Sequence, residues 1–153
     1  MKKICILGGG AIGSCVSASL TDAGLDVVLV DQWSDHIDKI RADGLTVISQ
    51  EGEKNTRVIA HHISDMAKLQ PEFDYIFMAV KAYDTQWMSK FASVYLKEDG
   101  VFVGLQNAYN DDLNAEMIGK KNVIGAVVEL SCEIFNPGIV QRNTVPSGTW
   151  FAV

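Results

Sequence analysis

The hydrophobic pattern changes period twice near the start of the chain. Lys3–Leu7 and Asp26–Asp31 are short, largely apolar runs, which is typical of strands buried on both faces of a sheet. Between them, apolar side chains recur at helical spacing from Ile12 to Ala23. The pattern predicts a strand, a helix and a second strand, in that order.

Shorter and more polar segments follow. Ile37 and Ile40 share one face of a predicted helix over Ser34–Asp43. Leu45–Ser49 and Thr56–His61 then favour two strands joined by a polar turn at residues 50–55. We expect this hairpin to extend the sheet or to cap its edge.

The alternation of strand and helix resumes in the second half. Strands are predicted at Phe73–Val80, Gly100–Leu105 and Val123–Leu130, with helices after Asp84 and over Asp111–Ile118. The helix that Asp84 is expected to cap carries an apolar stripe that we interpret as core: Trp87, Met88, Phe91, Val94 and Tyr95.

The end of the chain differs from this alternation. Asn136-Pro137-Gly138 is a turn signal between two short apolar runs, and Thr149–Val153 is one more predicted strand. We therefore predict one α/β domain over residues 1–153. Its Rossmann-like, doubly wound sheet should be mainly parallel, with a terminal antiparallel hairpin.

The turn after the first strand carries the strongest functional signal. Gly8-Gly9-Gly10-Ala11-Ile12-Gly13 matches G-x-G-x-x-G between a predicted strand and helix. The first glycine permits the tight bend, the second lets the backbone approach a pyrophosphate, and the third allows close packing of helix and strand. The helix N-terminus adds unpaired N–H groups and partial positive charge. The turn predicts dinucleotide binding, with a ligand-free glycine turn as the alternative.

Asp31 ends the second strand, where a carboxylate can accept both hydroxyls of an adenosine ribose. The alternative is a helix cap, but Ser34 is the better candidate for that role, which leaves Asp31 free for the ribose. A carboxylate here would repel a 2′-phosphate, so the sequence favours NAD over NADP.

Net charge and cysteine content limit the kinds of partner, metal site and location that we expect for this chain. The net charge of −6 disfavours nucleic acid and acidic membranes. Cys5, Cys15 and Cys132 lie in apolar stretches, which favours buried thiols in a reducing compartment over disulfides or a metal site. No apolar run is long enough to span a membrane, and three glycines interrupt the only signal-like segment. We expect a cytoplasmic protein without a metal.

Five segments, in order, resemble the N-terminal domain of the ketopantoate reductase (2-dehydropantoate 2-reductase) family. They extend along nearly the whole chain: Ile6–Gly13, His36–Leu45, Ala79–Thr85, Gln106-Asn107, and Gly125-Ala126 followed by Pro137-Gly138. The resemblance implies an oxidoreductase of pantothenate biosynthesis. Such an enzyme transfers a hydride from NAD(P)H to a 2-oxo acid such as 2-dehydropantoate, and the product is a 2-hydroxy acid.

The same resemblance implies roles for individual residues. Cofactor contacts are expected from the glycine turn, Asp31, Val80, Lys81, Asn107 and a backbone group of Ser131. Lys81 and Asn107 would also bind the small-molecule substrate. Their alternatives are a solvated lysine at a strand end and a turn-forming asparagine.

The chain also departs from the family. Ala108 stands where the family has glycine after the asparagine, which indicates another loop shape or another substrate. Gln32-Trp33 follows Asp31 where many members carry arginine for a 2′-phosphate, in agreement with NAD. Glu129 is unusual beneath a nicotinamide and favours a carboxylate at a sheet edge over a substrate contact.

The family's second, helical domain supplies its catalytic lysine, and this chain stops at Val153. We therefore expect no catalytic residue here, and dinucleotide binding without useful reduction. We expect the sequence to represent a separated domain or a truncated gene product. A homodimer is the one assembly that the resemblance suggests. The alternatives are a stand-alone regulatory NAD sensor or a structural module that has lost its ligand.

Overall fold

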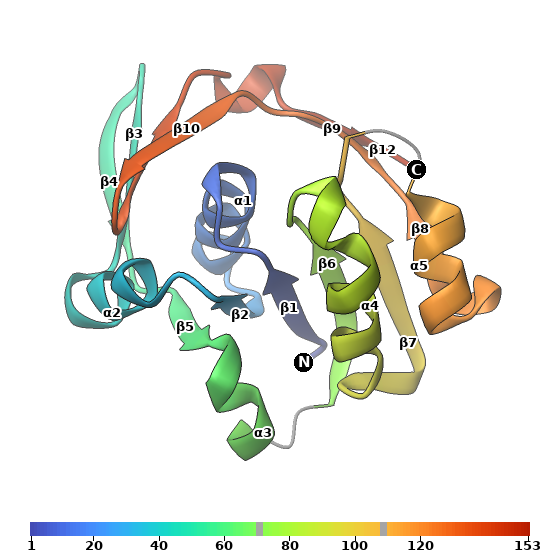
Figure 1. The fold of residues 1–153 in the computed structure, drawn as a ribbon. Coiled ribbons are helices and arrows are strands. Elements are labelled where there is room, and N and C mark those ends of the chain that lie inside the picture. The colour runs from blue at the N-terminus through green and yellow to red at the C-terminus, as the bar shows by residue number, and fades with distance from the viewer. Residues whose placement is uncertain (70–71, 108–109) are drawn as a thin grey trace.

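The computed structural model describes residues 1–69, 72–107 and 110–153. A six-stranded sheet forms its centre, with the order β5-β2-β1-β6-β7-β8 and every neighbouring pair parallel (Figure 1). Its strands are β1 (Lys3–Leu7), β2 (Asp26–Asp31), β5 (Ile59–His62), β6 (Phe73–Met78), β7 (Leu96–Gly104) and β8 (Val123–Gly125). The strand order reverses between β1 and β6, where open α/β sheets place their ligands.

Helices cover both faces of this sheet, as its residue pattern requires. They are α1 (Ala11–Asp22), α2 (Ser34–Asp43), α3 (Met66–Leu69), α4 (Thr85–Ser93) and α5 (Asp111–Ile118). Ile4 and Ile6 of β1 belong to the core beneath α1 and α2, whereas Cys5 and Leu7 belong to the core beneath α3 and α4. Because successive strand residues point to opposite faces, β1 is apolar throughout. The expected doubly wound parallel sheet is confirmed.

A second sheet lies over α1, in the order β10-β11-β3-β4 (Figure 1). It consists of β3 (Leu45–Ser49), β4 (Gly52–Thr56), β10 (Cys132–Asn136) and β11 (Ile139–Arg142). The predicted terminal hairpin is the antiparallel pair β10–β11, and it joins the early hairpin because β11 pairs in parallel with β3.

The early hairpin differs from the expectation in its second strand. Leu45–Ser49 pairs with Gly52–Thr56, so most of the expected polar turn is itself a strand. Thr56–His61 is not one strand, because Thr56 ends β4 and Ile59 begins β5 of the central sheet. Cross-strand pairing with Leu45–Ser49 outweighs the low strand propensity of this polar segment.

The predicted strand Val123–Leu130 is also divided. β8 ends at Gly125, and the Ala126 N–H still donates to Gly104 O at 2.9 Å. Beyond it, β9 (Val127–Glu129) leaves the central sheet and pairs antiparallel with β12 (Trp150–Ala152). The predicted strand near the end of the chain is thus present, and Glu129 is exposed on a two-stranded sheet.

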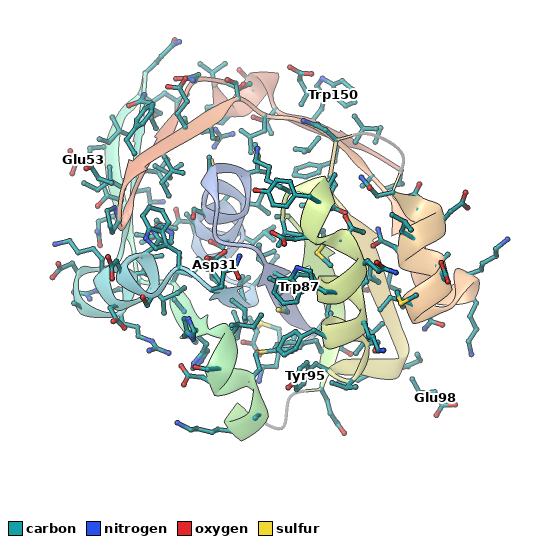
Figure 2. All side chains as sticks on the ribbon, viewed as in Figure 1. Asp31, Glu53, Trp87, Tyr95, Glu98 and Trp150 are labelled. Atoms are coloured by element: carbon teal, nitrogen blue, oxygen red, sulfur yellow. The ribbon has the colours of Figure 1, made fainter. Side chains whose placement is uncertain are left out.

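The apolar stripe on α4 is only partly core. Met88 is buried, and Phe91 and Tyr95 pack against the same core, but Trp87 and Val94 are exposed. Trp87 and Tyr95 are labelled in Figure 2. Asp84 occupies the N-cap position without capping the helix, because its carboxylate accepts the Trp87 Nε1–H at 2.7 Å. The prediction of a fully buried stripe was therefore wrong at two of its positions.

Candidate functional site

A cleft of about 560 Å³ opens where β1 and β6 end. Its lining includes eight of the residues that the sequence singled out: Gly8, Gly10, Ala11, Ile12, Asp31, Val80, Lys81 and Asn107. They come from the glycine turn and from the segments after β2, β6 and β7. The carboxyl ends of parallel strands meet at one edge of the sheet, which brings these distant segments together.

The three fixed glycines of the turn have different reasons for lacking a side chain. A Cβ on Gly8, whose φ is +110°, would lie 2.8 Å from the Val80 nitrogen, and one on Gly13 would lie 1.8 Å from Gly8 O. Packing of strand and helix therefore excludes any larger residue at both positions. A Cβ on Gly10 would meet nothing within 4 Å. Since Gly10 lines the cleft, its bare backbone is available to a ligand.

The N-terminus of α1 opens at the same point. Gly10 is the N-cap residue and provides no capping side chain, and the first turn holds no acidic residue. The Ser14 N–H makes the first helical hydrogen bond, to Gly10 O at 2.9 Å. The N–H groups of the first turn lack partners within the helix, so they and the positive end of its dipole favour an anion.

Asp31 lines the cleft from the end of β2 (Figure 2). One carboxylate oxygen accepts the N–H of Gly9, and the other accepts the N–H of Trp33 at 2.7 Å. The expectation that Ser34 caps α2 and leaves Asp31 free was wrong, because Trp33 is the N-cap residue and its side chain does not cap. A carboxylate has about four acceptor sites, so capacity for a ligand remains.

Lys81 and Asn107 are exposed and line the cleft beyond β6 and β7. Between them lies Gln106, whose role the sequence did not reveal. Its Nε2 donates to Val80 O at 3.0 Å and to Thr85 Oγ1 at 2.7 Å. Gln106 thus joins the ends of both strands to the first residue of α4. Ala108, the departure from the family pattern, lies outside the described residues.

The remaining predicted residues do not line the cleft. Gly9 and Gly13 are buried beneath it. Ser131 N–H donates to Thr144 Oγ1 at 2.8 Å, and its carbonyl accepts the Asn143 N–H at 2.8 Å. Its neighbours Leu130 and Cys132 line the cleft instead.

The cysteines are free, and Cys5 and Cys15 are buried, as predicted. Cys132 is only half-buried, contrary to the prediction, and the neighbouring Cys15 thiol, together with burial, raises the pKa of the Cys132 thiol. Within residues 1–69, 72–107 and 110–153, no cluster of three metal-ligating side chains occurs. No helix in this part of the chain is long and apolar enough to cross a membrane.

A parallel sheet with this strand order, a glycine turn at its reversal point and a carboxylate ending the next strand define the Rossmann-like class of α/β domains. Residues 4–153 match the family model described as ketopantoate reductase PanE/ApbA. The chain belongs to this family.

Individual relatives agree with this assignment. The chain is 32% identical over 140 residues to a 2-dehydropantoate 2-reductase of Pyrococcus abyssi, covering 91% of the chain and 44% of the relative. It is 30% identical over 142 residues to one of Nostoc sp., covering 92% and 43%. A PanE/ApbA family ketopantoate reductase structure from Ralstonia eutropha has a TM-score of 0.82 at 28% identity, covering 92% and 46%. The chain spans less than half the length of these relatives.

Proposed function

We propose that this chain is the cofactor-binding domain of an oxidoreductase that reduces a 2-oxo acid, such as 2-dehydropantoate, to the 2-hydroxy acid with NADH. The observation that carries the proposal is the single cleft shared by the glycine turn, Asp31, Lys81 and Asn107. Family membership supports the reaction class.

The residues present fit a dinucleotide. The open side of Gly10 and the first turn of α1 would hold the pyrophosphate, and Asp31 would accept hydroxyl groups of the adenosine ribose. When bound, the nicotinamide supplies the hydride. The Gln106 hydrogen bonds hold the ends of β6 and β7 together, which orients the segments that carry Lys81 and Asn107.

Lys81 and Asn107 would bind the substrate beside the cofactor. The lysine ammonium provides positive charge for a 2-oxo acid, and the asparagine amide can donate to a ribose or substrate oxygen. By the family resemblance, the general acid for the developing alkoxide would come from a further domain. The site favours this function over a regulatory sensor, because a sensor has no need of substrate-binding groups next to the cofactor.

Substitution of Gly10 tests the cofactor site. In Gly10→Ala the new methyl group has open space and an unstrained backbone, with φ at −68°, so the melting temperature should stay near that of the wild type. The same methyl group would occupy the space of the pyrophosphate and weaken NADH binding by about tenfold or more. Fluorescence titration with NADH and thermal unfolding measure both quantities.

Gly13→Ala is the contrasting variant, because its methyl group clashes with Gly8 O and should lower the melting temperature. Wild-type affinity for NADH in a folded Gly10→Ala variant would contradict the proposed pyrophosphate site.

A further inference from the structure

A buried chain of hydrogen bonds joins the glycine turn to the β10–β11 hairpin. The Gly138 N–H donates to His36 Nδ1 at 2.9 Å, across 102 residues of sequence. His36 Nε2 lies 3.0 Å from Ser14 Oγ, which donates to Gly9 O at 2.9 Å. His36 and Ser14 have no exposed surface. This series of hydrogen bonds therefore runs through the interior from the hairpin turn, by way of α2 and α1, to the glycine turn.

The donors and acceptors determine the direction of this chain. Because the backbone N–H of Gly138 can only donate, His36 Nδ1 carries its lone pair and the imidazole proton lies on Nε2. Nε2–H then donates to the Ser14 hydroxyl, whose own proton goes to Gly9 O. Every member has a partner only while the imidazole is neutral.

The surroundings of His36 keep it in this form. Burial lowers its pKa, while the nearby Asp31 carboxylate acts in the opposite direction. Its ring stacks on Trp33 with centroids 5.1 Å apart, and Lys39 of the same helix packs against Gly138. At neutral pH the chain of hydrogen bonds is therefore intact.

Where this series of hydrogen bonds ends, at Gly9 O, it orients one peptide group of the glycine turn. In a trans peptide the C=O and the following N–H point in opposite directions. Since Ser14 holds Gly9 O inward, the Gly10 N–H is directed the other way, toward the cleft that Gly10 lines. The Gly9 N–H, which belongs to the preceding peptide, is engaged by Asp31, so both peptide groups that flank the Gly9 Cα are held.

We propose that His36 and Ser14 are positioning residues for the pyrophosphate of the bound dinucleotide, and that they couple the glycine turn to the β10–β11 hairpin through Gly138. The inference rests on the proposed function, since it concerns the affinity for a dinucleotide. It adds that His36 of α2 and Gly138 at the turn of the hairpin, neither of which lines the cleft, control this affinity.

Two serines of α1 provide a matched test in the 153-residue chain. Ser14 and Ser17 are both fully buried, but Ser17 Oγ donates only to Ser14 O within the helix, at 2.8 Å. Ser14→Ala should raise the Kd for NADH about tenfold, whereas Ser17→Ala should leave it within about twofold. The melting temperature, measured alongside, should fall further in Ser14→Ala, because this variant leaves the His36 Nε2–H and Gly9 O without their partner.

Two substitutions of His36 separate its hydrogen bond to Ser14 from its hydrogen bond to Gly138. Gln retains a donor near the position of Nε2, and Asn retains an acceptor near that of Nδ1. His36→Gln should bind NADH within about threefold of the wild type, whereas His36→Asn should weaken it about as much as Ser14→Ala. A purely structural role would instead reduce affinity in both variants in proportion to their loss of melting temperature.

The ¹⁵N NMR spectrum of the imidazole gives an independent readout, because it distinguishes the two neutral tautomers. A proton on Nδ1, or equal NADH affinities for Ser14→Ala and Ser17→Ala, would overturn the inference while leaving the proposed function intact. Failure of the wild-type chain to bind either NADH or NADPH would instead refute the proposed function.

Discussion

Asp31 combines a structural role with the recognition role that we propose for its carboxylate. It receives N–H groups from Gly9 and Trp33, so it fixes the glycine turn relative to the end of β2. Its negative charge lies at the edge of the cleft, where a 2′-phosphate on the ribose would approach it. If the proposed site is right, Asp31 links the shape of the turn to the choice of cofactor.

We expect the wild-type chain to bind NADH at least about tenfold more tightly than NADPH, because the carboxylate repels a phosphate. Asp31→Asn removes the charge and should bring the two dissociation constants to within about threefold. Paired titrations with NADH and NADPH measure this ratio. Asp35→Asn removes an exposed charge nearby and should leave the preference unchanged. Tighter binding of NADPH by the wild type would disprove the cofactor assignment.

Asp74 of β6 predicts a pH dependence of stability. Its carboxylate accepts the Lys3 N–H at 2.8 Å and the ammonium groups of Lys2 and Lys97 at 3.0 and 3.1 Å. These contacts, the Lys3 N–H first among them, hold the pKa of Asp74 well below its usual range. The resulting stabilisation is complete above the unfolded-state pKa of about 3.9 and is lost as the pH falls toward the folded-state pKa.

Asp74→Asn should therefore lower the free energy of unfolding at pH 7, and the difference from the wild type should shrink at about pH 3. Urea unfolding at the two pH values measures this change. Asp99→Asn, an exposed position at the same end of the sheet, serves as the control. An equal effect of Asp74→Asn at both pH values would show that the charge is not the cause.

At the scale of elements, Gln106 connects three of them. Hydrogen bonds from its side-chain amide to Val80 O and Thr85 Oγ1 join the end of β7 to the segment after β6 and to the start of α4. The substrate-binding candidates Lys81 and Asn107 lie on the segments that it joins. Their spacing therefore depends on a side chain that need not contact the ligand.

Gln106→Leu keeps the approximate volume but leaves Val80 O and Thr85 Oγ1 without this donor. We expect the free energy of unfolding to fall by about 1–3 kcal/mol, and the affinity for NADH to decrease as the segment after β6 loosens. Chemical denaturation and NADH titration test the two effects. Gln86→Leu, at an exposed position on α4, should change neither. Unaltered stability in Gln106→Leu would rule out the proposed connection.

The strands also show where the local sequence pattern is no longer sufficient to predict the structure. Lys3–Leu7 and Asp26–Asp31 were predicted with their observed bounds, because burial on both faces makes the strands apolar throughout. Gly52–Thr56 was predicted as mostly turn, since its strand character comes from pairing with β3 rather than from its own residues. Val123–Leu130 was predicted as one strand because nothing in its apolar pattern reveals a change of partner sheet at Ala126.

At the scale of the whole molecule, this chain supplies the cleft in which we propose that the cofactor binds. The chain spans 43% to 44% of the 2-dehydropantoate 2-reductases of Nostoc sp. and Pyrococcus abyssi, so the proposed reaction belongs to a protein of their length. We expect the 153-residue chain to bind NADH without measurable reduction of a 2-oxo acid.

In a protein of the relatives' length that contains this chain, Lys81→Ala should lower kcat/KM for the 2-oxo acid by about a hundredfold, because the substrate loses a group that orients it. Steady-state NADH oxidation measures the change. Lys90→Ala removes an exposed ammonium from α4 and should have no effect. Unchanged kinetics for Lys81→Ala would remove Lys81 from the substrate site.

The sequence by itself determined the glycine turn, Asp31 and the alternating strands and helices, because backbone freedom at glycine and hydrophobic period are properties of neighbouring residues. Only the tertiary structure decided which distant segments meet. It placed Lys81, Asn107 and Cys132 in one cleft, and it joined Gly138 to His36 across 102 residues. Such contacts depend on strand pairing and on the partners available to buried polar groups, and neither can be deduced from local spacing.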